Sequence, residues 1–315
     1  MSRNLDFDLE NLPWLDRHLA EIDEYVDSLD RTLFRFELRE KLLHWLRFGF
    51  VKFENAIEHE LIDSYLEDID LVMSGESNSG VRLQIEGLGI KEARHLTNED
   101  LRVKHLRVTD MHNISMAGKC LSLHPVVTDF LGHVFRQEVV AMQSLTFIHG
   151  TEQRSHQDFA YVRAGIPSHL AASWIALEDV DPDAGPLFYL PGSHMVQKFD
   201  WGNGLFLTPE SSFDENQFAD FLEAKCAEVG LNKEIFCPKK GDIFFWHAGL
   251  VHGGSPTNQR SLTRKSYVTH YSSSSAYKTD RRAPDVTPTV FSLNGGSIFA
   301  DPINPSEENR FQYPR

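Results

Sequence analysis

The sequence predicts a mainly β fold of the sandwich, jelly-roll or barrel type, with helices concentrated in its N-terminal part. Apolar residues recur at helical spacing in the first third of the chain. From residue 139 onward, short apolar segments separated by Gly and Pro indicate many strands joined by turns. Hydrophobic residues make up 41% and charged residues 24% of the 315 residues, so the chain can bury a sizeable core.

The first 135 residues are expected to form a mostly helical front end. Apolar residues recur at helical spacing, with acidic residues between them, over residues 14–29, 37–48, 57–72 and 123–135. Gly49 ends the second of these helices, and the apolar residues of 50–53 follow it as a short strand. Pro125 is tolerated in the last helix because it falls in the first turn.

The β-rich body is expected over residues 136–271. Its strand-like segments are residues 139–148, 170–177, 187–190, 242–246 and 266–271. A helical insertion is expected near residues 213–229. The Pro- and Asn-rich tail, residues 272–315, is expected to fold over the barrel mouth as a lid, to pack against a second subunit or to be disordered. No internal repeat occurs, and residues 1–315 are interpreted as a single domain.

The charge and cysteine content argue against several classes of partner. The chain has 31 basic and 46 acidic residues, and its formal net charge is −15. No basic cluster offers a phosphate-binding surface, so a nucleic-acid partner is not expected. Three separated cysteines fit reduced thiols. The charged N-terminal segment has no apolar signal core, and no stretch reaches the ~20 apolar residues of a membrane helix. We therefore expect a cytoplasmic monomer or homodimer without a membrane span.

A His-x-Asp unit is the most informative chemical motif. If residues 156–158 lie on a strand, His156 and Asp158 point to the same face, because side chains alternate along a strand. His252 follows 96 residues later (252 − 156). Two histidines and one carboxylate form the set that binds non-haem Fe(II) and leaves other coordination positions open. Taken alone, the unit is a weak signal, because 15 histidines make chance occurrences common, and a structural His–Asp hydrogen bond is then the better interpretation.

Four segments, in order, resemble the phytanoyl-CoA dioxygenase family. They are SHQDFAYV, WIALEDVDPDAGPLFYLPGSH, GDIFFWHAGLVHGGSP and RKSYVTHY, and LREKLLHWLRFGFVKFENAI is similar to the family's opening helix and strand. The resemblance extends over residues 36–271 and is strongest between Gln143 and Tyr271. It implies a double-stranded β-helix (jelly-roll, cupin-like) core flanked by N-terminal helices, and an Fe(II)- and 2-oxoglutarate-dependent oxygenase.

The resemblance assigns the central residues of the site. It implies that His156, Asp158 and His252 are the iron ligands and the catalytic centre. It also implies that Arg264 binds the far carboxylate of 2-oxoglutarate, a role that suits a planar guanidinium because it forms paired hydrogen bonds with a carboxylate. Arg260 is the alternative, but RKSYVTHY matches the family strand that follows the arginine.

Three further residues are expected to contact the cosubstrate. Gln143 lies on the strand before the His-x-Asp unit and can donate to 2-oxoglutarate, and Trp174 can form a wall of its pocket. Simple core filling is an equally good interpretation of both. The family hydroxyl two residues after the second histidine is replaced here by Gly254, and Ser255 is the nearest substitute.

Two other histidines near the motifs are not expected to bind the metal. His247 lies five residues before His252 and therefore faces the opposite side of a strand, which favours a supporting role. His194 belongs to the PGSH turn and is interpreted as structural or pocket-lining. Residues expected to line the substrate pocket come from Phe159, Tyr161, residues 85–112 and the tail after residue 271.

The implied reaction is hydroxylation of an aliphatic C–H bond of a small molecule, with O2 consumed and succinate and CO2 released. The carboxylate of Asp158 favours hydroxylation over halogenation, because related halogenases have a small residue at this position. No Lys and Arg cluster suits the phosphates of CoA, so an unnamed small metabolite is preferred over an acyl-CoA. The alternatives are a desaturase or epimerase with the same iron centre, a non-catalytic cupin-like ligand-binding module, and a zinc hydrolase.

Overall fold

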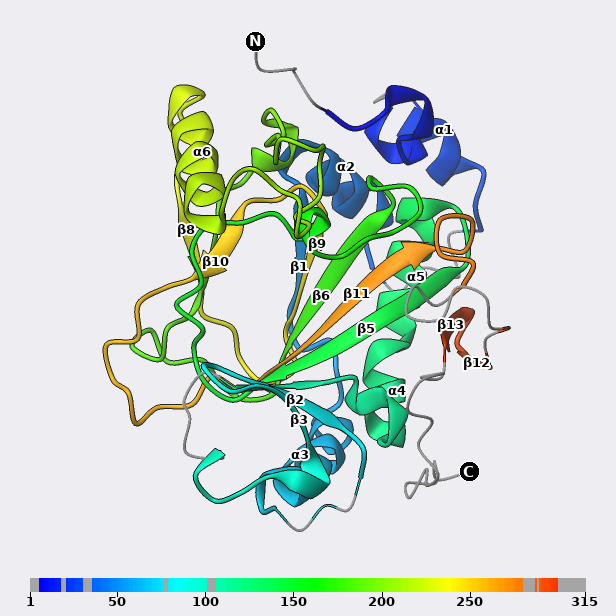
Figure 1. The fold of residues 1–315 in the computed structure, drawn as a ribbon. Coiled ribbons are helices and arrows are strands. Elements are labelled where there is room, and N and C mark those ends of the chain that lie inside the picture. The colour runs from blue at the N-terminus through cyan, green and yellow to red at the C-terminus, as the bar shows by residue number, and fades with distance from the viewer. Residues whose placement is uncertain are drawn as a thin grey trace.

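The computed structural model describes residues 6–17, 21–30, 36–75, 77, 79–100, 106–279, 287 and 289–299. It contains two sheets that lie face to face with helices around them (Figure 1). The strands are β1 (Phe50–Phe53), β2 (Arg82–Ile85), β3 (Gly89–Glu92), β4 (Leu106–Thr109), β5 (Val139–Phe147), β6 (Leu170–Ala176), β7 (Leu187–Tyr189), β8 (Glu234–Phe236), β9 (Ile243–His247), β10 (His252–Gly254), β11 (Ser266–Ser273), β12 (Val290–Leu293) and β13 (Gly296–Phe299).

The larger sheet has ten strands, with the order β1-β9-β6-β11-β5-β4-β2-β3 along its main path. The strand β13 lies parallel to β5 and carries β12 as its other neighbour. The smaller sheet has the order β10-β7-β8. Pairs along the main path of the larger sheet and within the smaller sheet are antiparallel, as in a jelly roll.

Six α-helices surround the sheets: α1 (Glu21–Asp27), α2 (Leu38–Phe48), α3 (His59–Met73), α4 (Met116–Ser122), α5 (Pro125–Phe135) and α6 (Glu215–Glu228). In Figure 1, α4 and α5 run along one side of the larger sheet, and α6 lies beside β8 and β10. Within the described ranges, no helix has both the length and the apolar character that crossing a membrane requires.

Alternation along the strands gives the larger sheet two apolar faces. On one face, Phe245 of β9 packs against Phe130 of α5, with ring centroids 5.2 Å apart. On the other, the neighbouring Phe244 packs against Tyr189 of the smaller sheet, with centroids 4.8 Å apart. One core therefore lies between the sheet and the helices, and a second lies between the two sheets. This arrangement confirms the predicted jelly-roll fold class.

The helix expected over residues 14–29 is wrong in extent. The described part of this segment contains a 3-10 turn at Trp14–Asp16 and the short helix α1. Both are shaped by contacts with α5, because Trp14 Nε1 donates to the His133 carbonyl at 2.9 Å and the Tyr25 hydroxyl lies 2.8 Å from His133 Nδ1. These tertiary contacts override the continuous helical pattern.

The front end also contributes more strands than the sequence indicates. Besides the expected β1, the strands β2, β3 and β4 extend the larger sheet beyond β5. The expected helices over 37–48, 57–72, 123–135 and 213–229 are present as α2, α3, α5 and α6. An aspartate begins α6, since Asp214 accepts from the backbone N–H of Gln217 and the Gln217 side chain accepts from the backbone N–H of Asp214.

Candidate metal centre

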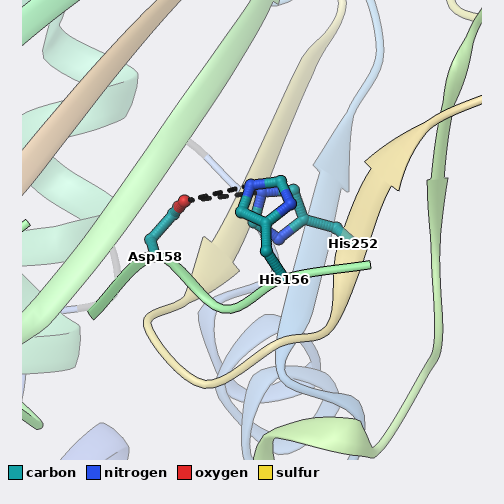
Figure 2. Close-up of side chains that lie close together, drawn as sticks. All are labelled: His156, Asp158 and His252. Atoms are coloured by element: carbon teal, nitrogen blue, oxygen red, sulfur yellow. Dashed lines mark ion pairs between the residues drawn. The ribbon is translucent and has the colours of Figure 1, made fainter. Parts of the chain in front are cut away.

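His156 and His252 are brought together by the backbone. They form an isolated antiparallel bridge in which each backbone N–H donates to the other carbonyl, at 3.0 and 3.1 Å. Their ring centroids lie 4.3 Å apart. The sequence predicts His156 and Asp158 on one strand, but Asp158 begins the 3-10 turn Asp158–Ala160. The turn still directs its carboxylate back toward both rings (Figure 2).

The three side chains present one ligand atom each to a common point. Nε2 of His156 and Nε2 of His252 both lie 3.6 Å from Asp158 Oδ1, and all three residues are buried. On each histidine, Nδ1 donates to a backbone carbonyl, that of Arg154 at 2.9 Å and that of Leu250 at 3.0 Å. The Nε2 lone pairs are therefore free for a metal. Two imidazoles and a carboxylate fit Fe(II).

The protonation states suit metal binding. Burial and the neighbouring His252 lower the pKa of His156 to about 4, so its ring is neutral near pH 7. Burial by itself raises the pKa of Asp158, but the facing histidines lower it by a larger amount. The pKa of Asp158 therefore lies well below the usual range for a carboxyl group. Both groups are thus in the forms that coordinate a cation.

The second oxygen of Asp158 has its own partners, which the sequence did not reveal. The indole Nε1 of Trp246 donates to Oδ2 at 2.6 Å. His270 Nε2 lies 3.3 Å from the same oxygen, close to it but not aligned for a hydrogen bond. Gln143 Nε2 lies 3.2 Å from His270 Nδ1, which orients the ring. These contacts engage Oδ2, so that Oδ1 is presented to His156 and His252 as the single ligand oxygen.

Replacing Trp246 by Phe is expected to weaken Fe(II) binding roughly 10- to 100-fold, the range for loss of a hydrogen bond to a metal ligand. The substitution keeps an aromatic ring in place and removes only the N–H group. Trp201→Phe is the matched control, because Trp201 is also buried and its Nε1 has no partner among the described residues. Competition with a chelator measures both affinities, and equal values in Trp246→Phe and wild type would contradict this role.

Arg264 lies in the same cavity as the three candidate ligands. The residue is 2% exposed, and its guanidinium carbon lies 5.8 Å from the Trp174 ring centroid and 5.9 Å from that of Phe147. Its Nε has no hydrogen-bond partner, and no carboxylate of the described residues pairs with it. Burial lowers the pKa of Arg264 to about 10. A buried cation without a counterion requires an anionic ligand or a large desolvation cost.

The other residues singled out in the sequence divide into two groups. Trp174 and Gln143 line the cavity, although Gln143 contacts His270. Ser255 lines a different cavity, of about 510 Å³, and its backbone N–H donates to the Pro186 carbonyl at 2.8 Å. We therefore leave Ser255 out of the cosubstrate site. The sequence could not show whether Ser255 lines the cosubstrate cavity, because this depends on the path of the backbone after His252.

His247 and His194 lie behind the candidate ligands. His247 Nε2 donates to Asp16 Oδ2 at 3.2 Å, and its Nδ1 accepts from the backbone N–H of Gly249 at 3.0 Å. The rings of His194 and His247 lie 5.3 Å apart, and His194 Nε2 donates to the Leu46 carbonyl at 3.1 Å. Neither residue lines the cavity. Both tie the core to N-terminal segments.

The cavity around the metal centre has a volume of about 430 Å³. Of the pocket residues expected from the sequence, Tyr161, Tyr277 and the 85–112 region contribute to its lining. Phe159 does not, because its ring packs edge-on against Phe7 with centroids 4.9 Å apart. Residues 280–286, 288 and 300–315 of the expected lid lie outside the described part of the chain.

Fold and site together define a cupin-like protein with a candidate metal site of two histidines and one carboxylate. A family model described as Phytanoyl-CoA dioxygenase (PhyH) matches residues 45–266, and the chain belongs to this family. Membership confirms the resemblance seen in the sequence.

Two curated proteins are similar over part of their length. Phytanoyl-CoA dioxygenase domain-containing protein 1 of Danio rerio is 27% identical over 168 residues, which cover 52% of this chain and 51% of that protein. The peroxisomal phytanoyl-CoA dioxygenase of Bos taurus is 28% identical over 132 residues, 40% of this chain and 35% of that protein. The matched region thus spans about half or less of these relatives.

Solved structures show the same fold at low identity. EctD from S. alaskensis with 2-oxoglutarate and 5-hydroxyectoine has a TM-score of 0.58 and 15% identity, with 87% of this chain and 91% of that chain covered. The epimerase SnoN in complex with Fe3+, alpha ketoglutarate and nogalamycin RO has a TM-score of 0.56 and 18% identity, with 83% and 98% covered. These likenesses support the cupin-like fold.

Proposed function

We propose that the protein is a hydroxylase that uses Fe(II), 2-oxoglutarate and O2 to oxidise an aliphatic C–H bond of a small metabolite, with release of succinate and CO2. The observation that carries this proposal is the buried guanidinium of Arg264, which has no counterion among the described residues and shares a cavity with His156, Asp158 and His252. A non-catalytic binding module needs no such combination of a metal set and a carboxylate receptor. A zinc hydrolase leaves Arg264 without a role.

Different residues of the cavity bind the metal and the cosubstrate. His156 and His252 offer neutral Nε2 atoms, and Asp158 offers one carboxylate oxygen because Trp246 binds the other. Iron held in this way supplies the oxygen-activating chemistry. Arg264 binds the far carboxylate of the cosubstrate, and the buried Trp174 ring excludes water from its wall of the cavity.

The size of the cavity supports a small substrate. Its volume of about 430 Å³ lies in the lower part of the ~300–1,000 Å³ range of small-molecule sites, and it must hold both cosubstrate and substrate. An acyl-CoA could enter this volume only with its acyl part, and its CoA portion would lie outside. The carboxylate of Asp158 favours hydroxylation over halogenation, because it occupies the coordination position that a halide ion requires.

The test is reconstitution of metal-free protein with Fe(II), 2-oxoglutarate and O2, followed by measurement of succinate. We expect slow succinate formation without added substrate, and none when Zn(II) replaces Fe(II) or when O2 is excluded. Arg260→Gln is the matched control for a substitution of Arg264, since Arg260 is exposed and does not line the cavity. Hydrolysis of ester or amide substrates with Zn(II) in the absence of O2 would favour the hydrolase instead.

A further inference from the structure

The charged side chains that line the cavity suggest what kind of substrate it takes. Among the described lining residues are three arginines and three carboxylates: Arg82, Arg107, Arg264, Asp110, Asp158 and Glu215. Four of the six have partners. Asp158 belongs to the metal set, Arg264 is assigned to the cosubstrate, and Arg82 forms an ion pair with Asp110 at 3.2 Å. Arg107 and Glu215 are the remaining cation and anion.

Arg107 is held by a neutral group. It lies on β4 directly opposite Gln84 of β2, and its Nε and Nη2 donate to Gln84 Oε1 at 2.9 and 2.5 Å. An amide oxygen orients the guanidinium without neutralising its charge. Arg107 is partly buried, and this burial lowers the pKa of its guanidinium. The cation is thus oriented, partly desolvated and without a carboxylate on it among the described residues.

Glu215 provides the opposite charge without pairing with Arg107. It lies in the first turn of α6, and its carboxylate interacts with the hydroxyl of Tyr161, a residue near the metal centre. Within the described chain no ion pair of 4 Å or less joins Glu215 to Arg107, although their charges interact at longer range. A gap between two opposite charges at one cavity can be bridged by a ligand that carries both.

Arg107 is also separate from the cosubstrate arginine. Phe147 of β5 is paired with Arg107 of β4 on one side and with Ser266 of β11 on the other. Arg264, two residues before Ser266, approaches the Phe147 ring from the β11 side. Two guanidinium groups therefore flank the strand that carries Phe147, which provides two anion sites instead of one.

We propose that the primary substrate is a small zwitterionic metabolite whose anionic group binds Arg107 and whose cationic group binds Glu215. The inference rests on the proposed function, because it assigns Arg264 to 2-oxoglutarate. Loss of one charged hydrogen-bonding partner weakens binding by roughly 10- to 100-fold. Such a substrate brings an anionic group to the partly buried Arg107, which has no carboxylate partner among the described residues, and a cationic group to the exposed carboxylate of Glu215.

The experiment uses the anaerobic complex of the full chain with Fe(II) and 2-oxoglutarate. Its visible charge-transfer band shifts when a substrate enters the iron site, so binding is read without turnover. The probes are α-amino acids and straight-chain ω-amino acids, each tested beside its primary amide and its N-acetyl derivative. We expect at least one amino acid to shift the band and to bind at least about tenfold more tightly than either derivative.

Three variants test the two contacts. Arg107→Gln is expected to keep the band and to bind the parent amino acid no better than wild type binds its amide. Glu215→Gln is expected to remove the preference over the N-acetyl derivative, and Arg260→Gln is expected to behave as wild type. Loss of the band itself in Arg107→Gln would assign Arg107 to the cosubstrate and overturn the proposal.

Two further outcomes separate the proposals. A band that no amino acid shifts, or that neutral derivatives shift equally well, contradicts the zwitterionic substrate and leaves the oxygenase intact. Absence of the band in the wild-type protein contradicts the proposed function instead.

Discussion

Replacing Asp158 by Ala or Asn is expected to abolish iron-dependent activity and to weaken Fe(II) binding by more than about 100-fold, beyond the range for outer hydrogen-bonding partners. The physical reason is the position of Oδ1, which lies 3.6 Å from Nε2 of both His156 and His252. Asn keeps an oxygen that can accept from the Trp246 indole but removes the negative charge that binds a cation. Ala removes both.

The matched control for this substitution is Asp16→Asn. Asp16 also pairs with a buried histidine, His247 at 3.2 Å, but the pair lies outside the cavity. Iron affinity is measured by competition with a chelator, and thermal unfolding of the metal-free proteins shows whether each variant folds. Full iron affinity in a folded Asp158→Ala protein would show that the metal binds elsewhere.

Replacing Arg264 by Met is expected to have opposite effects on stability and on cosubstrate binding. The metal-free protein should be as stable as wild type or more stable, because the variant removes a buried cation that has no counterion among the described residues. The Kd for 2-oxoglutarate should rise by roughly 100-fold or more, since two charged hydrogen bonds to a carboxylate are lost. Arg264→Lys keeps the charge and should retain part of the affinity.

Thermal unfolding and isothermal titration with 2-oxoglutarate measure these two effects separately. A variant that loses stability and binding together would indicate that Arg264 is a structural residue. A variant that keeps normal 2-oxoglutarate affinity would assign the cosubstrate carboxylate to another cation, with Arg107 the first candidate in the same cavity.

The candidate ligands could be predicted from the sequence because the chain presents them in a local motif and a recognisable context. His156 and Asp158 are two residues apart, and His252 precedes a Gly-Gly turn. Trp246 and His270 could not be predicted in the same way. Their contacts with Asp158 depend on the register of β9 and β11 relative to a turn, and strand register cannot be read from composition.

The strands β2 and β4 were missed for a related reason. Their cavity-facing side chains are polar, with Arg82 and Gln84 on one strand and Arg107 on the other. These polar residues alternate with buried Leu83 and Ile85 on β2 and with Leu106 and Val108 on β4, but each strand has only four residues, too few for the alternation to identify a strand in the sequence.

The most direct test of the oxygenase assignment is an anaerobic titration of metal-free protein with Fe(II) and then with 2-oxoglutarate, followed by visible absorption. We predict a charge-transfer band that saturates at one 2-oxoglutarate per protein in wild type and is absent in Asp158→Ala. We also predict that the band is absent in Arg264→Met at the cosubstrate concentration that saturates wild type. Iron that binds tightly to wild type without producing this band would contradict the assignment of the cavity as an iron- and 2-oxoglutarate-binding site.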